Sequence, residues 1–396
     1  MRKVFENEEN LIIYSWNIPK GGLPKVMLKE YYFFKDKGFR ATLVTSETAL
    51  RSVYLEELNN AGTIFIDFHS TTNEKGRDIS HFFPGLTVSM QEGVTKNVAK
   101  LNKFLICQKP SLVLAHQLLS GIIVFPFCVL FRKKFVIVLH DNPFLFMEND
   151  NYQRVNIKKK FVNSMVYFAA RLAFFYSYKV VFTSENIHNK VVKHVAVGKK
   201  GAVLDYGIEI FPKRNLKREF VSVVSKWSKF RNPQAYLELR KKLPSGIKFC
   251  IAGRWDSEEE YSEFNRTVTK AGYGDSLVIR KELTEEELSE LYDMTRVFVR
   301  LGFNESGTGQ AILEAIGHGC PVVISKSIGA SSLIGDGRHG FLVEETNLTD
   351  IAQKILLILR NNQLFEDMSN ACYDLARRNG WDDYLLKLAK CVFGES

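Results

Sequence analysis

The sequence predicts an α/β protein of two domains, each containing a parallel β-sheet covered by helices. Three observations support this: the length of the chain, an alternation of short apolar runs with longer segments of helical period, and one interruption of that alternation. At 396 residues, the chain exceeds what one hydrophobic core ordinarily organises. Strand-length runs that are apolar on both faces are typical of parallel sheets that helices cover on both sides.

The first half of the chain alternates predicted strands with predicted helices. A helix is expected at residues 25–37, where Gly38 ends it, and the polar segment 69–93 is expected to be a surface loop near a ligand mouth. Strands are expected at residues 11–15, 41–45, 63–67, 112–115, 135–139 and 180–183.

The alternation stops at residues 205–218 and then starts again. This segment contains Gly207, Pro212 and a cluster of basic residues, and is interpreted as a linker. In tandem open sheets, a ligand is expected where the carboxyl ends of the strands face each other. Strands are expected at 220–225, 247–252, 277–279, 297–300, 321–324 and 340–343, and helices at 233–242, 284–294, 310–317, 348–360, 365–378 and 381–392.

The net positive charge of the chain comes from its first half. The formal net charge is +10, and residues 1–212 contain 28 Lys and Arg against 18 Asp and Glu, whereas the remainder is balanced. A basic surface attracts nucleic acid, anionic lipid or phosphorylated substrates, and charge alone does not choose among them. A nucleic-acid binder is disfavoured because no recognised binding module is present.

Cysteine usage and apolar runs predict a cytoplasmic protein. The six cysteines are scattered, with no Cys-x-x-Cys pair and no zinc-like spacing, and are interpreted as buried thiols in a reducing compartment. Residues 1–10 lack the apolar core of a signal peptide. No run reaches the roughly 20 apolar residues of a membrane-spanning helix, since Pro126 interrupts 118–131 and Arg171 interrupts 161–175.

The strongest chemical signal is the predicted strand, glycine-rich loop and helix at residues 297–314. Gly307 and Gly309 let the backbone approach a ligand closely, and the following helix presents free N–H groups to negative charge. Glu314 lies about one turn into that helix, within reach of a hydroxyl-rich ligand. Taken alone, the pattern equally fits a tight turn followed by a solvated glutamate.

The surrounding sequence makes this signal specific. Residues 283–343 read LTEEELSELYDMTRVFVRLGFNESGTGQAILEAIGHGCPVVISKSIGASSLIGDGRHGFLV. This run resembles the donor-binding half of the retaining glycosyltransferases of glycosyltransferase family 4, whose pattern includes E-G-F-G-x-x-x-x-E-A and G-x-P-V. The resemblance implies a GT-B architecture of two Rossmann-like domains, with facing parallel sheets and an interdomain cleft. It also implies a nucleoside-diphosphate sugar as donor substrate, no cofactor and no metal.

The resemblance predicts three parts of the chain. Residues 1–212 are expected to form an acceptor-binding Rossmann-like domain and residues 213–380 a nucleotide-sugar-binding one. Residues 381–396 are expected to form a helix that crosses back to the first domain, beginning at Trp381.

One position of the motif departs from the family. The family has two glutamates seven residues apart, the first contacting the donor sugar and the second holding the ribose. Glu314 matches the second, but the first position is Ser306, with Glu305 one place earlier. Either Glu305 substitutes for it, Ser306 donates a hydroxyl to a differently shaped sugar, or donor-sugar chemistry is lost. The resemblance assigns the sugar and phosphate contacts to Gly307, Thr308, Gly309 and Gln310.

A second match to the family pattern predicts which cations hold the donor diphosphate. Residues 225–233, SKWSKFRNP, resemble the family pattern G-R-x-x-x-x-K in which an Arg and a Lys hold the donor diphosphate. Here the two positions are Lys226 and Arg231, with the residue types exchanged. Positive charge at both points meets the physical demand, because the leaving diphosphate accumulates negative charge.

The first half resembles the family less closely. The strand at 11–15 leads to Gly21 and Gly22, which resemble the first donor loop, and residues 110–121, PSLVLAHQLLSG, place His116 on a family histidine. His140, after the strand at 135–139, resembles another and is an acceptor-side candidate. Both histidines are interpreted either as hydrogen-bonded structural residues or as substrate contacts, His116 at the reacting centre. Residues 205–208, DYGI, stand where the family has N-G-I-D.

The basic residues of the first half bear on whether the acceptor is bound at a membrane. Lysines flank the aromatic-rich segment 161–175, which fits either a buried helix covering the sheet or a helix that contacts an anionic membrane. The expected acceptor is therefore a glycan, a lipid-linked molecule or another hydroxyl compound, with peripheral contact to the cytoplasmic face of a membrane left open.

The sequence as a whole predicts retaining transfer of a sugar from a nucleoside-diphosphate sugar to a hydroxyl acceptor, in the synthesis of a glycan, cell-surface polysaccharide or glycolipid. The missing first glutamate leaves a second hypothesis open, a catalytically silent glycosyltransferase-like partner subunit. A nucleotide-sugar epimerase on the same architecture is a lesser alternative.

Overall fold

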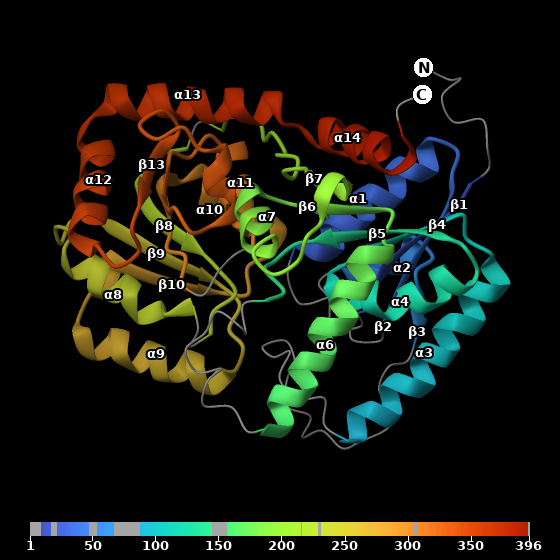
Figure 1. The fold of residues 1–396 in the computed structure, drawn as a ribbon. Coiled ribbons are helices and arrows are strands. Elements are labelled where there is room, and N and C mark those ends of the chain that lie inside the picture. Colours follow the sequence, from blue (N-terminus) through green and yellow to red (C-terminus); the bar gives the residue numbers. More distant parts are fainter. Residues whose placement is uncertain are drawn as a thin grey trace. The chain divides into compact units, whose positions relative to one another are not determined.

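The chain forms two compact α/β units (Figure 1). The computed structural model describes residues 9–16, 22–46, 54–66, 88–144, 157–214, 216–228, 231–303 and 307–394, with only the backbone of 46, 88–97, 157–163 and 275. Unit 1 comprises Met1–Thr183, Ile187–Leu204 and Lys387–Ser396, and unit 2 comprises Ser184–Asn186 and Asp205–Leu386. The functional labels expected for the two domains, and a cleft between them, stay predictions.

Unit 1 is built on a parallel sheet whose described strands lie in the order β3-β2-β1-β4-β5-β6-β7. The order reverses beside β1, which pairs with both β2 and β4. In α/β sheets such a reversal opens a crevice at the carboxyl ends of the strands. The strands are β1 (Asn10–Ser15), β2 (Arg40–Ser46), β3 (Ile64–Ile66), β4 (Leu112–His116), β5 (Lys134–Leu139), β6 (Lys179–Phe182) and β7 (Gly201–Val203).

Strands β1, β4, β5 and β6 of unit 1 are largely buried, as their unbroken apolar runs predict, whereas the edge strands β3 and β7 are only partly buried. One face of the sheet, carrying Ile12, Val113 and Ile137, packs in a core with residues of α3, α4, α6 and α7. These helices are α3 (Val88–Gln108), α4 (Leu118–Leu130), α6 (Ile157–Tyr176) and α7 (Glu185–Val191). The remaining helices of this part of the chain are α1 (Leu23–Asp36) and α2 (Leu55–Asn60).

Unit 2 repeats the same topology. Its described strands lie in the order β10-β9-β8-β11-β12-β13, all parallel, and the order reverses beside the first strand, β8. The strands are β8 (Phe220–Val224), β9 (Lys248–Gly253), β10 (Leu277–Lys281), β11 (Thr295–Arg300), β12 (Val322–Ser325) and β13 (Gly340–Val343).

The helices of unit 2 form where the sequence places capping residues. Thr284 and Glu287 make a reciprocal capping box at the start of α10 (Glu285–Asp293). Ser257, Asn347 and Asn361 accept backbone hydrogen bonds at the starts of α9 (Glu258–Ala271), α12 (Leu348–Arg360) and α13 (Asn362–Arg378). The remaining helices are α8 (Pro233–Lys241), α11 (Gln310–Gly317) and α14 (Trp381–Phe393).

The α/β fold class predicted from the sequence is confirmed, and three details differ. Residues 88–93, expected to belong to a loop, form the start of α3, while residues 67–87 lie outside the described part. The edge strand β7 was not predicted, because three residues, Gly-Ala-Val, are too short for a periodic signal. Cys107 is exposed and Cys391 half-buried, so the expectation of buried thiols is wrong for Cys107.

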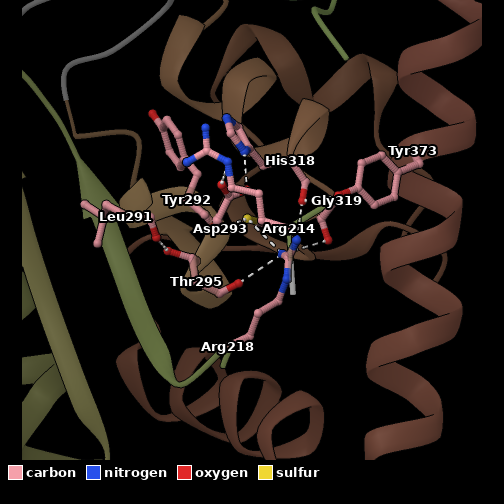
Figure 2. Close-up of polar contacts among 10 residues, drawn as sticks. Arg214, Arg218, Leu291, Tyr292, Asp293, Thr295, His318, Gly319 and Tyr373 are labelled. Atoms are coloured by element: carbon pink, nitrogen blue, oxygen red, sulfur yellow. Dashed lines mark hydrogen bonds and ion pairs between the residues drawn. The ribbon is translucent and has the colours of Figure 1, made fainter. Parts of the chain in front are cut away.

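The end of the linker is fixed to unit 2 by Arg218 (Figure 2). Its Nη1 donates to the carbonyl oxygens of Thr295 at 3.2 Å and Gly319 at 3.4 Å, and its Nη2 donates to His318 O at 2.5 Å. The Tyr373 hydroxyl donates to the same His318 oxygen at 2.9 Å. One guanidinium therefore satisfies carbonyl groups at the start of β11 and just after α11.

A buried hydrogen bond between Asp293 and His318 lies beside this guanidinium. Asp293 Oδ1 is 2.7 Å from His318 Nδ1, and the Nε of Arg214 is 3.4 Å from Asp293 Oδ2. The Phe211 ring stacks on His318 with centroids 3.9 Å apart. Burial lowers the pKa of His318 more than the Asp293 carboxylate raises it. The linker is thus joined to the carboxyl end of α11 through an imidazole that favours its neutral form.

We expect Arg218→Met to lower the free energy of unfolding by about 2 to 3 kcal/mol, because several carbonyl groups lose their donor at once. The matched control is Arg377→Met, whose guanidinium makes an exposed ion pair with Asp374 and should cost less than about 1 kcal/mol. Urea unfolding followed by fluorescence measures both. Equal losses in the two variants would contradict the role given to Arg218.

Candidate functional site

The order of the second sheet reverses between β8 and β11, and the predicted donor-binding residues of unit 2 follow these strands or lie on α11. Lys226 comes just after β8, and its Nζ is 2.9 Å from Asp256 Oδ1. This carboxylate follows β9, so it holds the ammonium group at the carboxyl edge of the sheet. The lysine side chain is about one-third exposed, which leaves it accessible to a ligand.

The loop that carries Lys226 is fixed by its neighbour Trp227. The indole is fully buried, and its Nε1 donates to Ala252 O at 2.8 Å. Trp227 and Trp255 also form an isolated parallel bridge beyond the ends of β8 and β9. Gly253 has φ +118, and a Cβ there would lie 1.9 Å from Ser225 O, so only glycine permits this approach. The local backbone is therefore rigid on both sides of Lys226.

Arg231 stands at the start of α8. Its backbone N–H donates to Ser228 O at 3.0 Å, and Asn232 takes a left-handed conformation before Pro233 begins the helix. Residues 229 and 230 lie outside the described part. Both predicted cations, Lys226 and Arg231, thus belong to the single connection between β8 and α8.

The glycine-rich loop before α11 is held by backbone contacts. Gly329 N donates to Gly307 O at 3.0 Å, and Ala330 N donates to Thr308 O at 3.2 Å. Gly309 has φ +77 and takes the N-cap position of α11, as the sequence predicts for a loop that ends in a helix. Glu305 and Ser306, the two candidates for the first acidic position, lie outside the described residues.

Two polar side chains lie in the first turns of α11. The Nε2 of Gln310 is buried and has no hydrogen-bond partner among the described residues. The Tyr292 hydroxyl, on the neighbouring α10, donates to Glu314 Oε2 at 3.2 Å. Burial and the Glu314 carboxylate hold the pKa of Tyr292 well above its ordinary value, so the phenol keeps its proton. α11 therefore presents an unused amide donor and an oriented carboxylate.

Arg300 is a cation that the sequence analysis missed. It is the last residue of β11, it is 6% exposed, and its Nη1 donates to Val224 O, at the end of β8, at 2.7 Å. A buried guanidinium joining two adjacent strand ends is costly unless its charge is used or satisfied. The sequence contains one signal for this buried cation, an Arg at the end of the apolar strand sequence TRVFVR.

In unit 1, the two predicted histidines lie together on one face of the sheet. His116 ends β4, His140 follows β5, and their rings stack with centroids 5.0 Å apart. The Nδ1 of His116 is 2.8 Å from the Nε2 of His140. The Nε2 of His116 is 2.8 Å from the Oε2 of Glu30, which is fully buried on α1. His116 is itself fully buried, so of the two histidines it is the half-buried His140 that retains exposed surface.

The glutamate partner of His116 was not predicted. Glu30 lies in the sequence KEYY, between lysine and tyrosine, and nothing distinguishes it from a solvated helix residue. Only the packing of α1 on the sheet shows that its side chain is fully buried. Of the two predicted glycines near the start of α1, Gly22 is the N-cap residue and Gly21 lies outside the described part.

Among the described residues, no group of three or more His, Cys, Asp or Glu side chains comes together as a metal site. The arrangement in unit 2 combines Lys226, Arg231 and Arg300 with the amide groups at the start of α11. Such a set suits an anion whose charge is spread over several oxygens.

The fold of this chain occurs in solved structures of sugar-binding proteins. The Anabaena protein HepE in complex with UDP and glucose superimposes with a TM-score of 0.75 at 15% identity, covering 98% of this chain and 100% of that one. The sucrose-phosphate synthase of Thermosynechococcus elongatus gives a TM-score of 0.78 at 14% identity, covering 96% and 98% of the two chains. The chain therefore has the GT-B fold of a large class of glycosyltransferases.

The sequence comparison also finds glycosyltransferases. Residues 209–375, which lie in unit 2, match the family described as glycosyl transferases group 1. An uncharacterized glycosyltransferase of Methanocaldococcus jannaschii is 21% identical over 252 residues, which are 59% of this chain and 61% of that protein. The D-inositol 3-phosphate glycosyltransferase of Paenarthrobacter aurescens is 28% identical over 158 residues, 39% of this chain and 38% of that protein. The matches thus span less than two thirds of either relative.

We expect His116→Gln to raise the pKa of His140. Burial, and secondarily the neighbouring His116, hold the pKa of His140 well below its ordinary value, so removing the second cause lets it rise while burial keeps it below about 6.5. Titration of the histidine ring signals by NMR measures this, with His140→Gln for assignment. An unchanged or lower pKa of His140 in His116→Gln would contradict the coupling.

Proposed function

We propose that this protein is a retaining glycosyltransferase that moves a sugar from a nucleoside-diphosphate sugar to a hydroxyl acceptor. The observation that carries the proposal is the set of groups at the reversal of the second sheet. There, Lys226 and Arg231 lie on one loop, and α11 carries an unpaired Gln310 amide and the oriented Glu314. The match of residues 209–375 to the glycosyl transferases group 1 family supports it.

The donor diphosphate would bind to the cations and to the start of α11. Two or three positive side chains neutralise the phosphate oxygens, and the free N–H groups of the loop at residues 307–310 add hydrogen bonds. Glu314 would accept hydrogen bonds from the ribose hydroxyls, as the resemblance to the family implies. HepE was crystallised with UDP and glucose, and this supports UDP as the first nucleotide to test.

In the transfer step, the acceptor oxygen forms a bond to the anomeric carbon while the bond from that carbon to the diphosphate oxygen breaks. The acceptor proton leaves with the diphosphate, so atoms and charges balance. Negative charge grows on the leaving group, and Lys226, Arg231 and the α11 amides would stabilise it. Because the sugar keeps its anomeric configuration, acceptor and leaving group occupy the same face of the ring.

Unit 1 would bind the acceptor. Its net positive charge favours an acceptor with phosphate groups or one attached to an anionic lipid, and the inositol-phosphate glycosyltransferase relative supports such an acceptor. All six cysteines are free thiols, which supports a cytoplasmic location because reducing compartments keep thiols unpaired. His140 would lie on the acceptor side, with His116 and Glu30 behind it.

The alternative, a catalytically silent partner subunit, is favoured by one observation: Ser306 replaces the first glutamate of the family pattern. Calorimetry of the purified chain with UDP, GDP and ADP, followed by a donor-hydrolysis panel, separates the two. Binding of a nucleoside diphosphate with turnover supports the enzyme. Binding without turnover, even with cell extracts as acceptor, favours the silent partner, and no binding to any of the three would overturn both.

We expect Glu314→Gln and Arg231→Gln each to weaken nucleoside-diphosphate binding by about tenfold to a hundredfold, since each removes a charge-assisted contact of roughly 1.5 to 3 kcal/mol. Arg266→Gln is the matched control, because Arg266 is exposed on α9. Isothermal titration calorimetry measures all three. A control that loses as much affinity as Arg231→Gln would argue against a diphosphate contact.

We expect Tyr292→Phe to weaken binding by about threefold to tenfold, because it removes only the hydrogen bond that orients Glu314, roughly 0.5 to 1.5 kcal/mol. Tyr373→Phe also removes a buried hydroxyl, but that hydroxyl donates to His318 O, and we expect its affinity to be unchanged. Glu314→Gln combined with Tyr292→Phe should cost no more than Glu314→Gln alone. Additive losses would show that Tyr292 acts independently of Glu314.

A further inference from the structure

The helix α6 has two apolar faces, and only one of them is covered. Ala170, Ala173 and Phe174 are buried in the core of unit 1. Met165, Phe168 and Phe175, spaced three and seven residues apart, are 58%, 64% and 69% exposed. Of the two interpretations of residues 161–175, a buried helix fits one face of α6, whereas the other face is exposed. Uncovered aromatic residues at helical spacing indicate an interaction surface.

The end of α4 extends this surface. Leu130 is 75% exposed, and Phe131, just after the helix, is 44% exposed. One ring contact joins the two helices: Phe125 of α4 stacks on Tyr176 at the end of α6 with centroids 6.5 Å apart. In Figure 1, α4 and α6 lie side by side over the first sheet. We call Met165, Phe168, Phe175, Tyr176, Val129, Leu130 and Phe131 the apolar face.

The sequence that carries the apolar face has a positive net charge. Residues 112–204 contain 13 Lys and Arg against four Asp and Glu. Lys200 Nζ lies 5.6 Å from the centroid of the Phe175 ring and donates to Phe175 O. Arg171 is exposed on α6 itself. The surface thus combines exposed apolar side chains with neighbouring cations.

We propose that the apolar face docks on an anionic membrane surface. Its exposed apolar side chains would enter the boundary between headgroups and acyl chains, and Arg171 and the surrounding lysines would pair with lipid phosphates. Among the helices in the described ranges, none combines the length and apolar character that a membrane crossing requires. The attachment is therefore inferred to lie along the bilayer surface.

The composition of the apolar face favours a membrane over two other partners, a second copy of the chain and single-stranded nucleic acid. A second copy of the chain would bring the same net positive charge against itself, which costs energy. Single-stranded nucleic acid binds aromatic rings on which bases stack, but Leu130, Val129 and Met165 offer no ring. A bilayer accepts aliphatic and aromatic side chains alike, and its anionic lipids match the charge.

Co-sedimentation with vesicles tests the proposal. We expect the full chain to bind vesicles of phosphatidylcholine and phosphatidylglycerol at low salt, to bind less at moderate salt, and to bind pure phosphatidylcholine at least tenfold more weakly. The double variant Phe168→Ser/Phe175→Ser should lose at least tenfold in vesicle affinity. Its matched control, Ile210→Ser/Leu357→Ser, replaces residues of unit 2 that are 47% and 46% exposed and should bind as the unchanged protein does.

Two further measurements keep the test decisive. Arg171→Gln/Lys199→Gln should reduce both the affinity and its salt dependence, and thermal unfolding should be alike in all variants because the replaced side chains are exposed. Full binding by Phe168→Ser/Phe175→Ser, or no binding to anionic vesicles at low salt, would overturn the proposal. Release from vesicles by a single-stranded oligonucleotide, or dimerisation through this face in size-exclusion chromatography, would also overturn it.

Discussion

The parallel pairing of β8 with both β9 and β11 is the constraint on which the candidate site of unit 2 depends. After β8 the chain continues into α8, which packs in the core on one face of the sheet, whereas after β11 it continues into α11. Because the connections from adjacent strands diverge, the carboxyl edge between them stays open. Lys226 and Arg231 follow β8 and the start of α11 follows β11, so the strand order places residues nearly ninety positions apart after two adjacent strands.

The position of α11 is set at its far end as well. The linker residues Phe211 and Arg218 contact His318 and its carbonyl group, just beyond the helix, and Asp293 pairs with the same imidazole. Near the other end, Tyr292 of α10 bonds to Glu314. Asp293 and Tyr292 are neighbours in sequence, so α10 holds α11 at two points. An α-helix fixed in this way can present a carboxylate in one orientation, which a ribose contact requires.

Polar and charged side chains of unit 1 occupy two different environments, one buried and one exposed. Inside, Glu30, His116 and His140 form a row of polar side chains behind the strand ends, and burial favours the neutral form of His140. Outside, residues 112–204, which carry the apolar face of α4 and α6, contain 13 Lys and Arg against four Asp and Glu. The exposed cations among them are available to a partner surface.

The sequence by itself determined the fold class, the strand-helix order and the glycine-rich loop before α11, because apolar periodicity, caps and glycines act over a few residues. It also predicted donor contacts for Glu314 and the two cations through their spacing, and these stay predictions. Only the tertiary structure decided that Glu30 is buried against His116, that Arg300 joins the ends of β8 and β11, and that α6 leaves Phe168 and Phe175 uncovered. The physical reason is that burial and pairing depend on which elements pack together, and a local pattern carries no record of its distant neighbours.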